Sequence, residues 1–160
     1  MHWTHSSASQ QFHGFTTSLF HQKPSIFATV INENMQRIIE CIPNISEGRD
    51  KAKINAITSV VETIPGVMLL DVDPGASTNR TVITFAGEPE AVAEAAFQLI
   101  KKAQELIDMR THKGEHPRMG ATDVCPLIPV AGISMEETAE YARKLAKRVG
   151  EELHIPAYLY

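Results

Sequence analysis

The sequence contains few cysteines: only Cys41 and Cys125 occur among its 160 residues. They form neither a CxxC pair nor the dense cysteine pattern of a secreted disulfide scaffold. We therefore expect both to be small apolar side chains in a protein of the reducing cytoplasm.

The chain also lacks an excess of positive charge and any long apolar segment. Its formal net charge is -4 and its pI is near 6.0, and no local cluster of lysine and arginine offsets this balance, so we expect no nucleic-acid partner. No apolar run reaches the roughly 18 to 20 residues that a membrane-spanning helix needs, and the N-terminus lacks the apolar core of a secretory signal. We expect a soluble protein without a membrane partner.

The first 34 residues differ in composition from the rest. They contain only two charged side chains, Lys23 and Glu33, and hold four of the seven histidines. A scarcity of acids suits a mitochondrial presequence, but such presequences are rich in arginine and this segment has none. We expect residues 1–34 to be a disordered leader or a non-native extension, and residues 35–160 to form one domain.

From Met35 onward the apolar pattern alternates between strand and helix periods. Short apolar runs bounded by turn residues predict strands at 37–43, 67–73, 81–87, 121–130 and 155–160. Apolar residues at three- and four-residue spacing predict helices over 54–64, 89–107 and 134–153. The order β-α-β-β-α-β followed by α-β is typical of an α/β (α+β) fold, a ferredoxin-like split β-α-β mixed sheet with helices on one face. The other face of such a sheet needs a partner or a substrate.

Polar side chains suited to catalysis or binding fall in three connections between these elements, at 41–50, 71–80 and 112–123. Loops of this kind often carry function, because a rigid scaffold holds their ends while their backbone is free to present groups. We therefore expect the functional residues of this chain to lie in these three loops.

The segment HKGEHPRMG, residues 112–120, contains two histidines four residues apart. On a helix His112 and His116 would share a face and could bind a metal, but the glycine and the proline here oppose a helix, and neither an HExxH order nor a third ligand is present. We expect no metal. Two interpretations remain, a solvated loop without function or a general base, because histidine takes and returns protons near neutral pH. The neighbouring Glu115 and Arg118 favour the second.

The other two loops each allow two interpretations. Asp71 and Asp73 are two apart on a strand and so point to the same face, where one of them could orient a histidine or cap the following turn. Asn79 and Arg80 either bind a substrate carboxylate or are ordinary turn residues. Asn44 precedes a helix N-terminus, where it either contacts an anion or acts as a cap.

Four segments, ECIPNISEG, LLDVDPGASTNRTVITFAG, LIDMRTHKGEHPRMGATDVCPLIPV and IPAYLY, resemble the N-terminal subdomain of the glutamate formiminotransferase family, the transferase part of formiminotransferase-cyclodeaminase. The resemblance covers residues 35–160 and nothing in residues 1–34. It implies a ferredoxin-like subdomain of a cytoplasmic transferase in histidine degradation and one-carbon metabolism. Such an enzyme transfers the formimino group from N-formimino-L-glutamate to N5 of its co-substrate tetrahydrofolate, without a metal.

The same resemblance implies roles for individual residues. His116, in the motif EHPRMG, matches the catalytic base of the family, and Asp73 and Arg118 match residues that line its site. Further polar residues of the three loops form the expected substrate-binding set: Asn44, Asn79, Arg80 and Glu115.

The family's transferase also has a second subdomain, whose sheet faces the first across a folate tunnel. We expect the present chain to be a truncated fragment, to work with a separately encoded second subdomain, or to self-associate through its uncovered sheet face. Two alternatives to a transferase remain open: a non-catalytic binding module derived from the same subdomain, and a metal-dependent hydrolase using His112 and His116.

Overall fold

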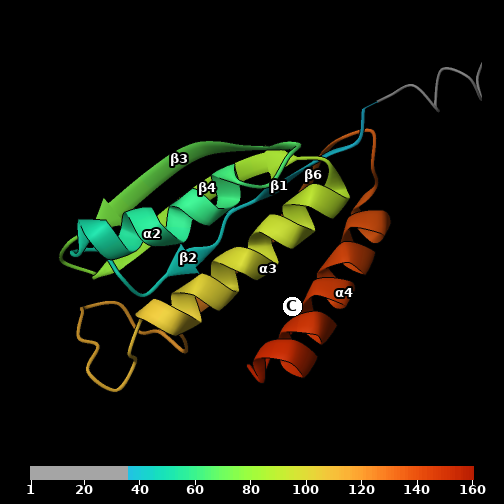
Figure 1. Cartoon of the computed structure of the whole chain (residues 1–160). Coiled ribbons are helices and arrows are strands. Elements are labelled where there is room, and N and C mark those ends of the chain that lie inside the picture. The colour runs from blue at the N-terminus through green and yellow to red at the C-terminus, as the bar shows by residue number, and fades with distance from the viewer. Residues whose placement is uncertain (1–35) are drawn as a thin grey trace, which may run out of the picture.

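The computed structural model describes residues 36–160 of the chain (Figure 1). The strands are β1 (Ile38–Cys41), β2 (Asn44–Ile45), β3 (Val67–Gly75), β4 (Arg80–Gly87), β5 (Thr122–Val124) and β6 (Leu127–Ala131). The helices are α2 (Lys51–Glu62), α3 (Pro89–Leu106) and α4 (Met135–Leu153). The prediction of a leader or extension at residues 1–34 lies outside the described residues.

The strands form a sheet of four lanes, since β1 and β2 follow one another in one lane, as do β5 and β6 in another. Ile39 pairs with Gly87 and Ile45 pairs with Thr81, so both short strands lie along the same side of β4. The lane of β5 and β6 lies beyond them at one edge, and β3 pairs with the other side of β4. The lanes therefore run in the order β5/β6, β2/β1, β4 and β3.

Every strand pair within residues 36–160 is antiparallel. Because β1 and β3 both run opposite to β4, they are parallel to each other, with β4 inserted between them. This arrangement is the predicted split β-α-β, and the α+β fold class is confirmed. The sheet is antiparallel rather than mixed, because the inserted strand keeps the two parallel strands from becoming neighbours.

The edge lane of β5 and β6 matches the strand predicted at 121–130, with an interruption. Pro126 has no N–H and cannot donate to a ladder, although its carbonyl accepts from the N–H of Ile42 at 3.2 Å. The prediction that the prolines confine this segment to an edge or an irregular path is confirmed.

The prediction of a strand at residues 155–160 is wrong. His154 ends α4 in the left-handed conformation, with a φ of 55°, and the following residues run back beside α4, where Ile155 and Leu159 line a groove with Ala146 and Gly150. This turn directs the segment along α4, where it pairs with no strand of the described residues, and Pro156 removes one donor that a strand would need.

Each helix begins at a residue that satisfies its first backbone N–H groups or suits its first turn. The Asp50 side chain accepts from the second and third N–H groups of α2, and Pro89 begins α3. The predicted capping box of α4 is confirmed: Ser134 accepts from the N–H of Glu137, and the Glu137 carboxylate accepts from the N–H of Ser134. Within residues 36–160, no helix has the length and apolar character needed to cross a membrane.

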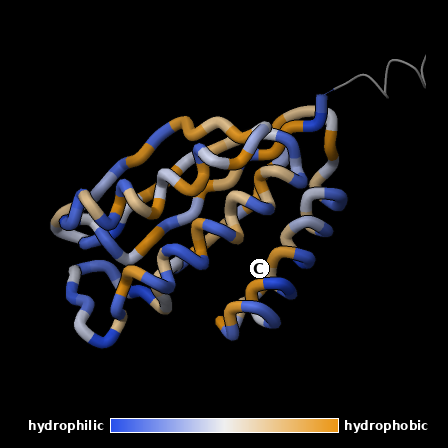
Figure 2. Tube along the Cα trace, in the orientation of Figure 1, coloured by the Kyte–Doolittle hydropathy of each residue, from blue (hydrophilic) through white to orange (hydrophobic). Residues whose placement is uncertain are grey.

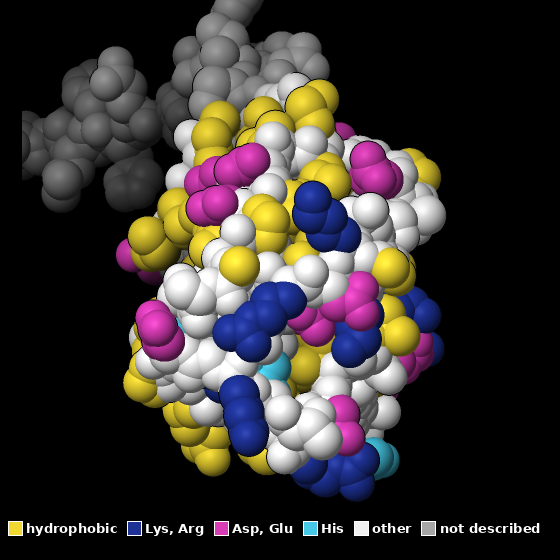
Figure 3. Space-filling model, turned by 90° about the vertical axis from the view of Figure 1, so that its left-hand side faces the viewer, with side chains coloured by type: hydrophobic (Ala, Val, Ile, Leu, Met, Phe, Trp, Pro, Cys, Tyr) yellow, Lys and Arg dark blue, Asp and Glu magenta, His cyan; other side chains and the backbone are white. Residues whose placement is uncertain are grey.

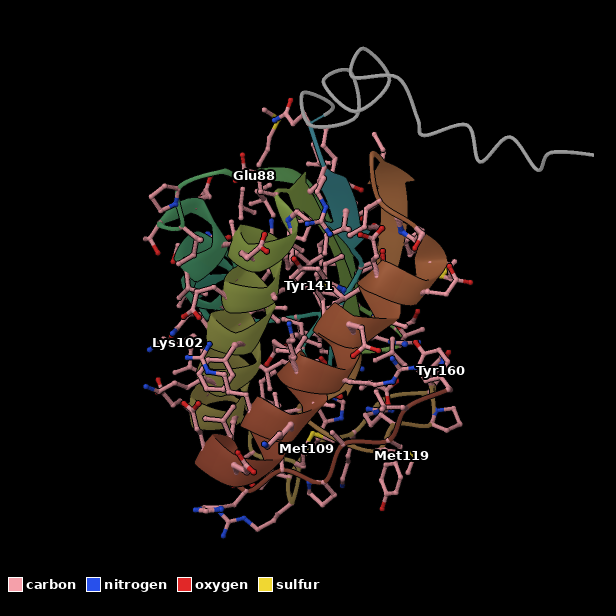
Figure 4. The ribbon with its side chains drawn as sticks, turned by 90° about the vertical axis from the view of Figure 1, so that its right-hand side faces the viewer. Glu88, Lys102, Met109, Met119, Tyr141 and Tyr160 are labelled. Carbon is pink, nitrogen blue, oxygen red and sulfur yellow. The ribbon has the colours of Figure 1, made fainter. Side chains whose placement is uncertain are left out.

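The core lies between the three helices and one face of the sheet. Alternate residues of the central lanes point into it and are fully buried, including Ile39, Ile83 and Phe85. Val92 and Leu99 of α3 are equally buried against them, and Figure 2 shows the apolar stripe of this helix facing the sheet. The amphipathic pattern read from the sequence thus corresponds to the helix face that packs on the strands. Tyr141 lies between α3 and α4 (Figure 4), and its hydroxyl donates to Glu90 in the first turn of α3.

The opposite face of the sheet has no helix over it within the described part of the chain, and we call it the open face. Val67 and Leu69 pack toward the core, so Met68 between them points to the open face and is 67% exposed. On the other edge lane, Ile128 pairs with Glu40, whose neighbour Ile39 points into the core, so Ile128 faces the open side and is 37% exposed. Exposed apolar side chains at both edges of one sheet face are typical of an interaction surface.

Candidate functional site

The three loops predicted to carry function lie together at one end of the sheet, which we call the rim. Ser46 ties the first loop to the third: its N–H donates to Ala121 O at 2.8 Å, and its hydroxyl donates to Gly120 O at 2.7 Å. Figure 3 views this end of the molecule and shows lysine and arginine side chains gathered around a histidine, with an acidic side chain beside it.

Asn79 connects all three loops. Its side-chain oxygen accepts from the N–H of Gly48 and its amide nitrogen donates to Lys113 O, both at 2.9 Å. Its backbone has a φ of 51°, a left-handed conformation that asparagine tolerates better than most residues. Because both polar atoms of the buried side chain are engaged within the protein, the structure shows Asn79 as a link between loops, and its substrate-binding role stays a prediction.

Glu47 closes the first loop over the start of α2. Its Oε1 accepts from the backbone N–H groups of Arg49 and Asp50 at 2.9 and 3.0 Å, and its Oε2 lies 3.6 Å from Lys53 Nζ. Burial by itself raises the pKa of Glu47, but the two backbone hydrogen bonds and the charge of Lys53 together outweigh it. The net effect is a lowered pKa.

We expect the Glu47→Gln variant to lose less stability on acidification than the wild type. The folded-state pKa of Glu47 lies below its ordinary value of 4.5, so the carboxylate stabilises the fold above that value, and this contribution is lost as the pH falls through the folded pKa. Urea denaturation of the wild type and of Glu47→Gln at about pH 7 and about pH 3 measures how much free energy of unfolding each protein loses. Glu62→Gln, at the exposed end of α2, is the control, and equal losses in wild type and Glu47→Gln would contradict the assignment.

His116 lies in the third loop with its ring exposed and contacts Arg80. Its Nε2 is 2.9 Å from Nη1 of Arg80, and its Nδ1 faces the carbonyl oxygen of Pro117. A guanidinium can only donate and a carbonyl can only accept, so Nδ1 carries the ring proton and Nε2 presents its lone pair. The ring is therefore neutral, and Nε2 is the only nitrogen that can take up a proton.

Arg80 is held in this position by Asp123, which the sequence reasoning missed. Nη2 of Arg80 lies 3.1 Å from Oδ2 of Asp123, and the other carboxylate oxygen accepts from the N–H of Met119 at 3.0 Å. Both charged side chains are largely buried. Nε of Arg80 is buried without a hydrogen-bond partner in the described residues, which costs about 1–3 kcal/mol. The only sequence signal for Asp123 is a lone carboxylate in an otherwise apolar edge segment.

His112 has the opposite tautomer to His116. Its Nδ1 accepts from Nη1 of Arg118, and its Nε2–H donates to Asn79 O at 3.1 Å. Arg118 also donates to Gly114 O at 2.7 Å and, through Nε, to His116 O at 2.8 Å. The guanidinium of Arg118 thus shapes the loop that carries His116, while its contact with a substrate carboxylate stays a prediction.

The surroundings of the two histidines do not suit a cation. Each ring accepts from an arginine, which brings positive charge to the nitrogen that would otherwise bind a metal. Within residues 36–160, no group of three or more histidine, cysteine or acidic side chains is arranged to hold a metal ion.

Asp71 and Asp73 point to the same side of β3, as predicted, and this side is the open face. Asp73 pairs with Val82 and Asp71 with Thr84, while Val72 packs toward the core. Asp73 is exposed, and no hydrogen bond or ion pair joins it to His116 in the described part of the chain. The orientation of the His116 ring therefore comes from Arg80 and Pro117, and the role of Asp73 stays a prediction.

The remaining two predicted binding residues lie at different places on the rim. Asn44 is buried in β2 and its amide donates to Ile42 O at 3.2 Å. Glu115 is exposed beside His116, and its backbone N–H faces Ser77 O at 3.5 Å. Of the two, only Glu115 has a side chain free to meet a ligand without rearrangement.

We expect Gly114→Ala to loosen the loop that carries His116. A Cβ at Gly114 would lie 2.2 Å from the backbone carbonyl oxygen of Thr78, so the two loops must separate, at a cost of about 1–3 kcal/mol. Hydrogen exchange of the 112–120 amides measures the opening. Gly150→Ala is the matched control, because the nearest atom to its new Cβ is 3.9 Å away, and equal exchange in both variants would contradict the prediction.

The fold and the rim together define a ferredoxin-like α+β domain that presents a neutral imidazole and two arginines at one end of its sheet. A family model described as "Formiminotransferase domain, N-terminal subdomain" matches residues 38–160. The chain belongs to this formiminotransferase family. The resemblance drawn from the sequence motifs is thereby confirmed.

Curated relatives agree with the family model. Formimidoyltransferase-cyclodeaminase of Rattus norvegicus is 55% identical over 126 residues, which are 79% of this chain and 23% of that protein. Glutamate formimidoyltransferase of Streptococcus pyogenes serotype M1 is 51% identical over 79% of this chain and 42% of its own length. That of Thermoplasma acidophilum is 49% identical over 77% of this chain and 41% of its own length. The chain thus spans less than half the length of these relatives.

Proposed function

We propose that this chain is the catalytic N-terminal half of a glutamate formimidoyltransferase. It transfers the formimino group of N-formimino-L-glutamate to N5 of tetrahydrofolate, which is a co-substrate, as a step of histidine degradation in the cytoplasm. The observation that carries the proposal is the neutral His116, whose Nε2 lone pair lies where the second and third loops meet. Close identity to proteins named for this reaction supports it.

The chemistry requires a base at this position. N5 of the folate attacks the amidine carbon, the new N5–C bond forms, and the bond from that carbon to the glutamate nitrogen breaks. The attacking nitrogen gains positive charge as the bond forms, so a base must remove its proton, and the departing glutamate nitrogen must receive one. Nε2 of His116 can take the first proton and return it to the leaving nitrogen.

The other rim residues would bind and orient the substrates. Arg80 and Arg118 supply cations for the carboxylates of glutamate and of the folate tail, and Glu115 offers an exposed carboxylate next to the base. Asp73, on the open face, would stabilise the imidazolium of His116 once the bound substrates draw the loop toward it. Holding both substrates with N5 next to the amidine carbon would supply much of the remaining rate enhancement.

The open face would receive the second half of the enzyme. The relatives are more than twice as long as the matched region, which leaves room for a further subdomain in each. Met68 and Ile128 supply apolar contacts at the two edges of the face. A second subdomain docked there would place a folate site between the two sheets, and self-association of this chain is the alternative occupant.

The two free thiols, one of them buried, suit the reducing cytoplasm we propose as the compartment. Cys41 and Cys125 lie 3.5 Å apart, sulfur to sulfur, on neighbouring lanes. Burial, followed by the contact with Cys125, raises the pKa of Cys41 well above its ordinary value, so this thiol stays protonated at neutral pH.

The proposal is tested by measuring formimino-tetrahydrofolate formation from N-formimino-L-glutamate and tetrahydrofolate. The chain is assayed alone and after addition of the purified second subdomain of a relative such as the Streptococcus pyogenes enzyme. Turnover that appears on addition identifies a half-enzyme. No turnover in either assay would refute the proposal and favour a non-catalytic binding module, which the short length of the chain relative to its relatives makes the second candidate.

A further inference from the structure

The contact between Arg80 and His116 occupies the nitrogen with which the base would take up a proton. Nε2 is the only nitrogen of His116 that has a lone pair to accept with, and Nη1 of Arg80 donates to it at 2.9 Å. A guanidinium has only donors and no acceptor, so Arg80 can meet this lone pair only by donating to it. While the contact persists, His116 has no position for an incoming proton.

We infer that Arg80 masks the base His116 until a substrate carboxylate draws the guanidinium away, and that Asp123 positions Arg80 for this exchange. The inference rests on the proposed function, because it assigns the carboxylate to the formimino donor. It makes Arg80 a residue that selects carboxylate-bearing amidines as substrates. Asp123 acts through Arg80 and is a positioning residue.

The relative strength of the contacts favours this exchange. A carboxylate accepts two parallel hydrogen bonds from a guanidinium with charge on both partners, whereas the ring of His116 accepts one bond in which only the donor is charged. N-Formimino-L-glutamate carries two carboxylates. It can therefore outcompete His116 for Arg80, and the lone pair of Nε2 becomes free as the substrate binds.

The unpaired donor of Arg80 supports the same conclusion. Nε of Arg80 is buried and has no acceptor within the described residues, although Nη1 and Nη2 are both engaged. The masked arrangement therefore leaves one donor of the guanidinium unsatisfied. A ligand oxygen that draws the side chain out would also satisfy this N–H, which lowers the cost of leaving His116.

Asp123 couples the position of Arg80 to the position of the loop. One of its carboxylate oxygens holds Nη2 of Arg80 at 3.1 Å, and the other holds the N–H of Met119 at 3.0 Å. Met119 follows His116 in the same loop. The same carboxylate thus holds Arg80 and the loop that carries His116, although no hydrogen bond joins it to His116 itself within the described residues.

The experiment is nitrogen-15 NMR of the histidine rings in the full chain, which distinguishes the two neutral tautomers directly. The His116 signals are identified among the seven histidines by their loss in His116→Asn. In the ligand-free wild type, His116 should show a fixed Nδ1–H tautomer with a hydrogen-bonded Nε2. Arg80→Met should give a mixture of both tautomers. Asp123→Asn should show a weaker preference for the Nδ1–H tautomer than the wild type. Arg80→Lys keeps one cationic donor and should partly restore the preference that Arg80→Met loses.

The probes are N-formimino-L-glutamate and formamidine, an amidine without a carboxylate, each at the same concentration. N-Formimino-L-glutamate should shift the Nε2 signal of wild-type His116 toward its position in the Arg80→Met variant. Formamidine should leave this signal unchanged. A wild-type ring that already exchanges between tautomers, or equal shifts with both probes, would overturn the inference. Circular dichroism confirms that each variant is folded, and Arg80→Lys provides the test if Arg80→Met is not.

The two hypotheses fail in different ways. A fixed tautomer released by Arg80→Met, in a protein that transfers no formimino group, would support the mask and refute the transferase. Transfer by a protein whose His116 signals are unchanged in Arg80→Met would support the transferase and refute the mask.

Discussion

The His116→Ala variant is expected to lose formimino transfer by about 10²–10⁴-fold, measured with the second subdomain present. Nε2 of His116 is the lone pair that receives the proton of N5, and the described rim offers no other neutral base in its place, since His112 directs its own lone pair at Arg118. Binding and orientation of the substrates do not depend on this ring, so a residual rate should remain. The rate of formimino-tetrahydrofolate formation measures the loss.

The controls separate a catalytic loss from unfolding. Because the ring of His116 is exposed, its removal should change the free energy of unfolding by no more than about 0.5 kcal/mol in urea denaturation. His154→Asn is the matched control, since His154 is exposed at the end of α4 and asparagine tolerates its left-handed backbone. Near-normal turnover in His116→Ala would refute the assignment of the base.

The Met68→Asp variant is expected to prevent the second subdomain from restoring activity. Burial of a methionine side chain contributes about 1.5–3 kcal/mol, and a carboxylate buried in its place costs several kcal/mol more. Since about 1.4 kcal/mol corresponds to a tenfold change in affinity, we expect the second subdomain to bind more than about a hundredfold more weakly. Titration of the second subdomain against transfer activity measures this affinity.

A second exposed methionine provides the control for Met68→Asp. Met135 is 61% exposed, close to the 67% of Met68, but it lies in the first turn of α4, where an acidic side chain is favourable. Met135→Asp should therefore leave the restoration of activity unchanged. If both variants are rescued equally well, the open face is not the docking surface.

The order of strands and helices was predictable because it depends on residues close together in the chain. The apolar period of α3 and the capping box at Ser134 and Glu137 are local patterns, and both are present as expected. The prediction of a strand at 155–160 was wrong because a strand forms only beside another strand that supplies its hydrogen-bond partners. The left-handed His154 turns that segment toward α4 instead.

The site was predictable only in part. The sequence pointed to three loops and to His116, because the residue types there suit proton transfer and carboxylate binding. It did not indicate Asp123, whose importance comes from its contact with Arg80, 43 residues away in the chain. Nor did it indicate that Asn79 links all three loops, since its partners Gly48 and Lys113 lie in separate connections.

The sequence by itself determined most of the helices and strands, the capping box of α4, the family and the loops that hold the polar groups, because each of these depends on short-range pattern or on motif identity. Only the tertiary structure decided which nitrogen of His116 bears the proton and which cation covers the other. That outcome depends on donors and acceptors brought together from β4, β5 and the third loop. No local pattern encodes such contacts, because they form only when the lanes of the sheet are assembled.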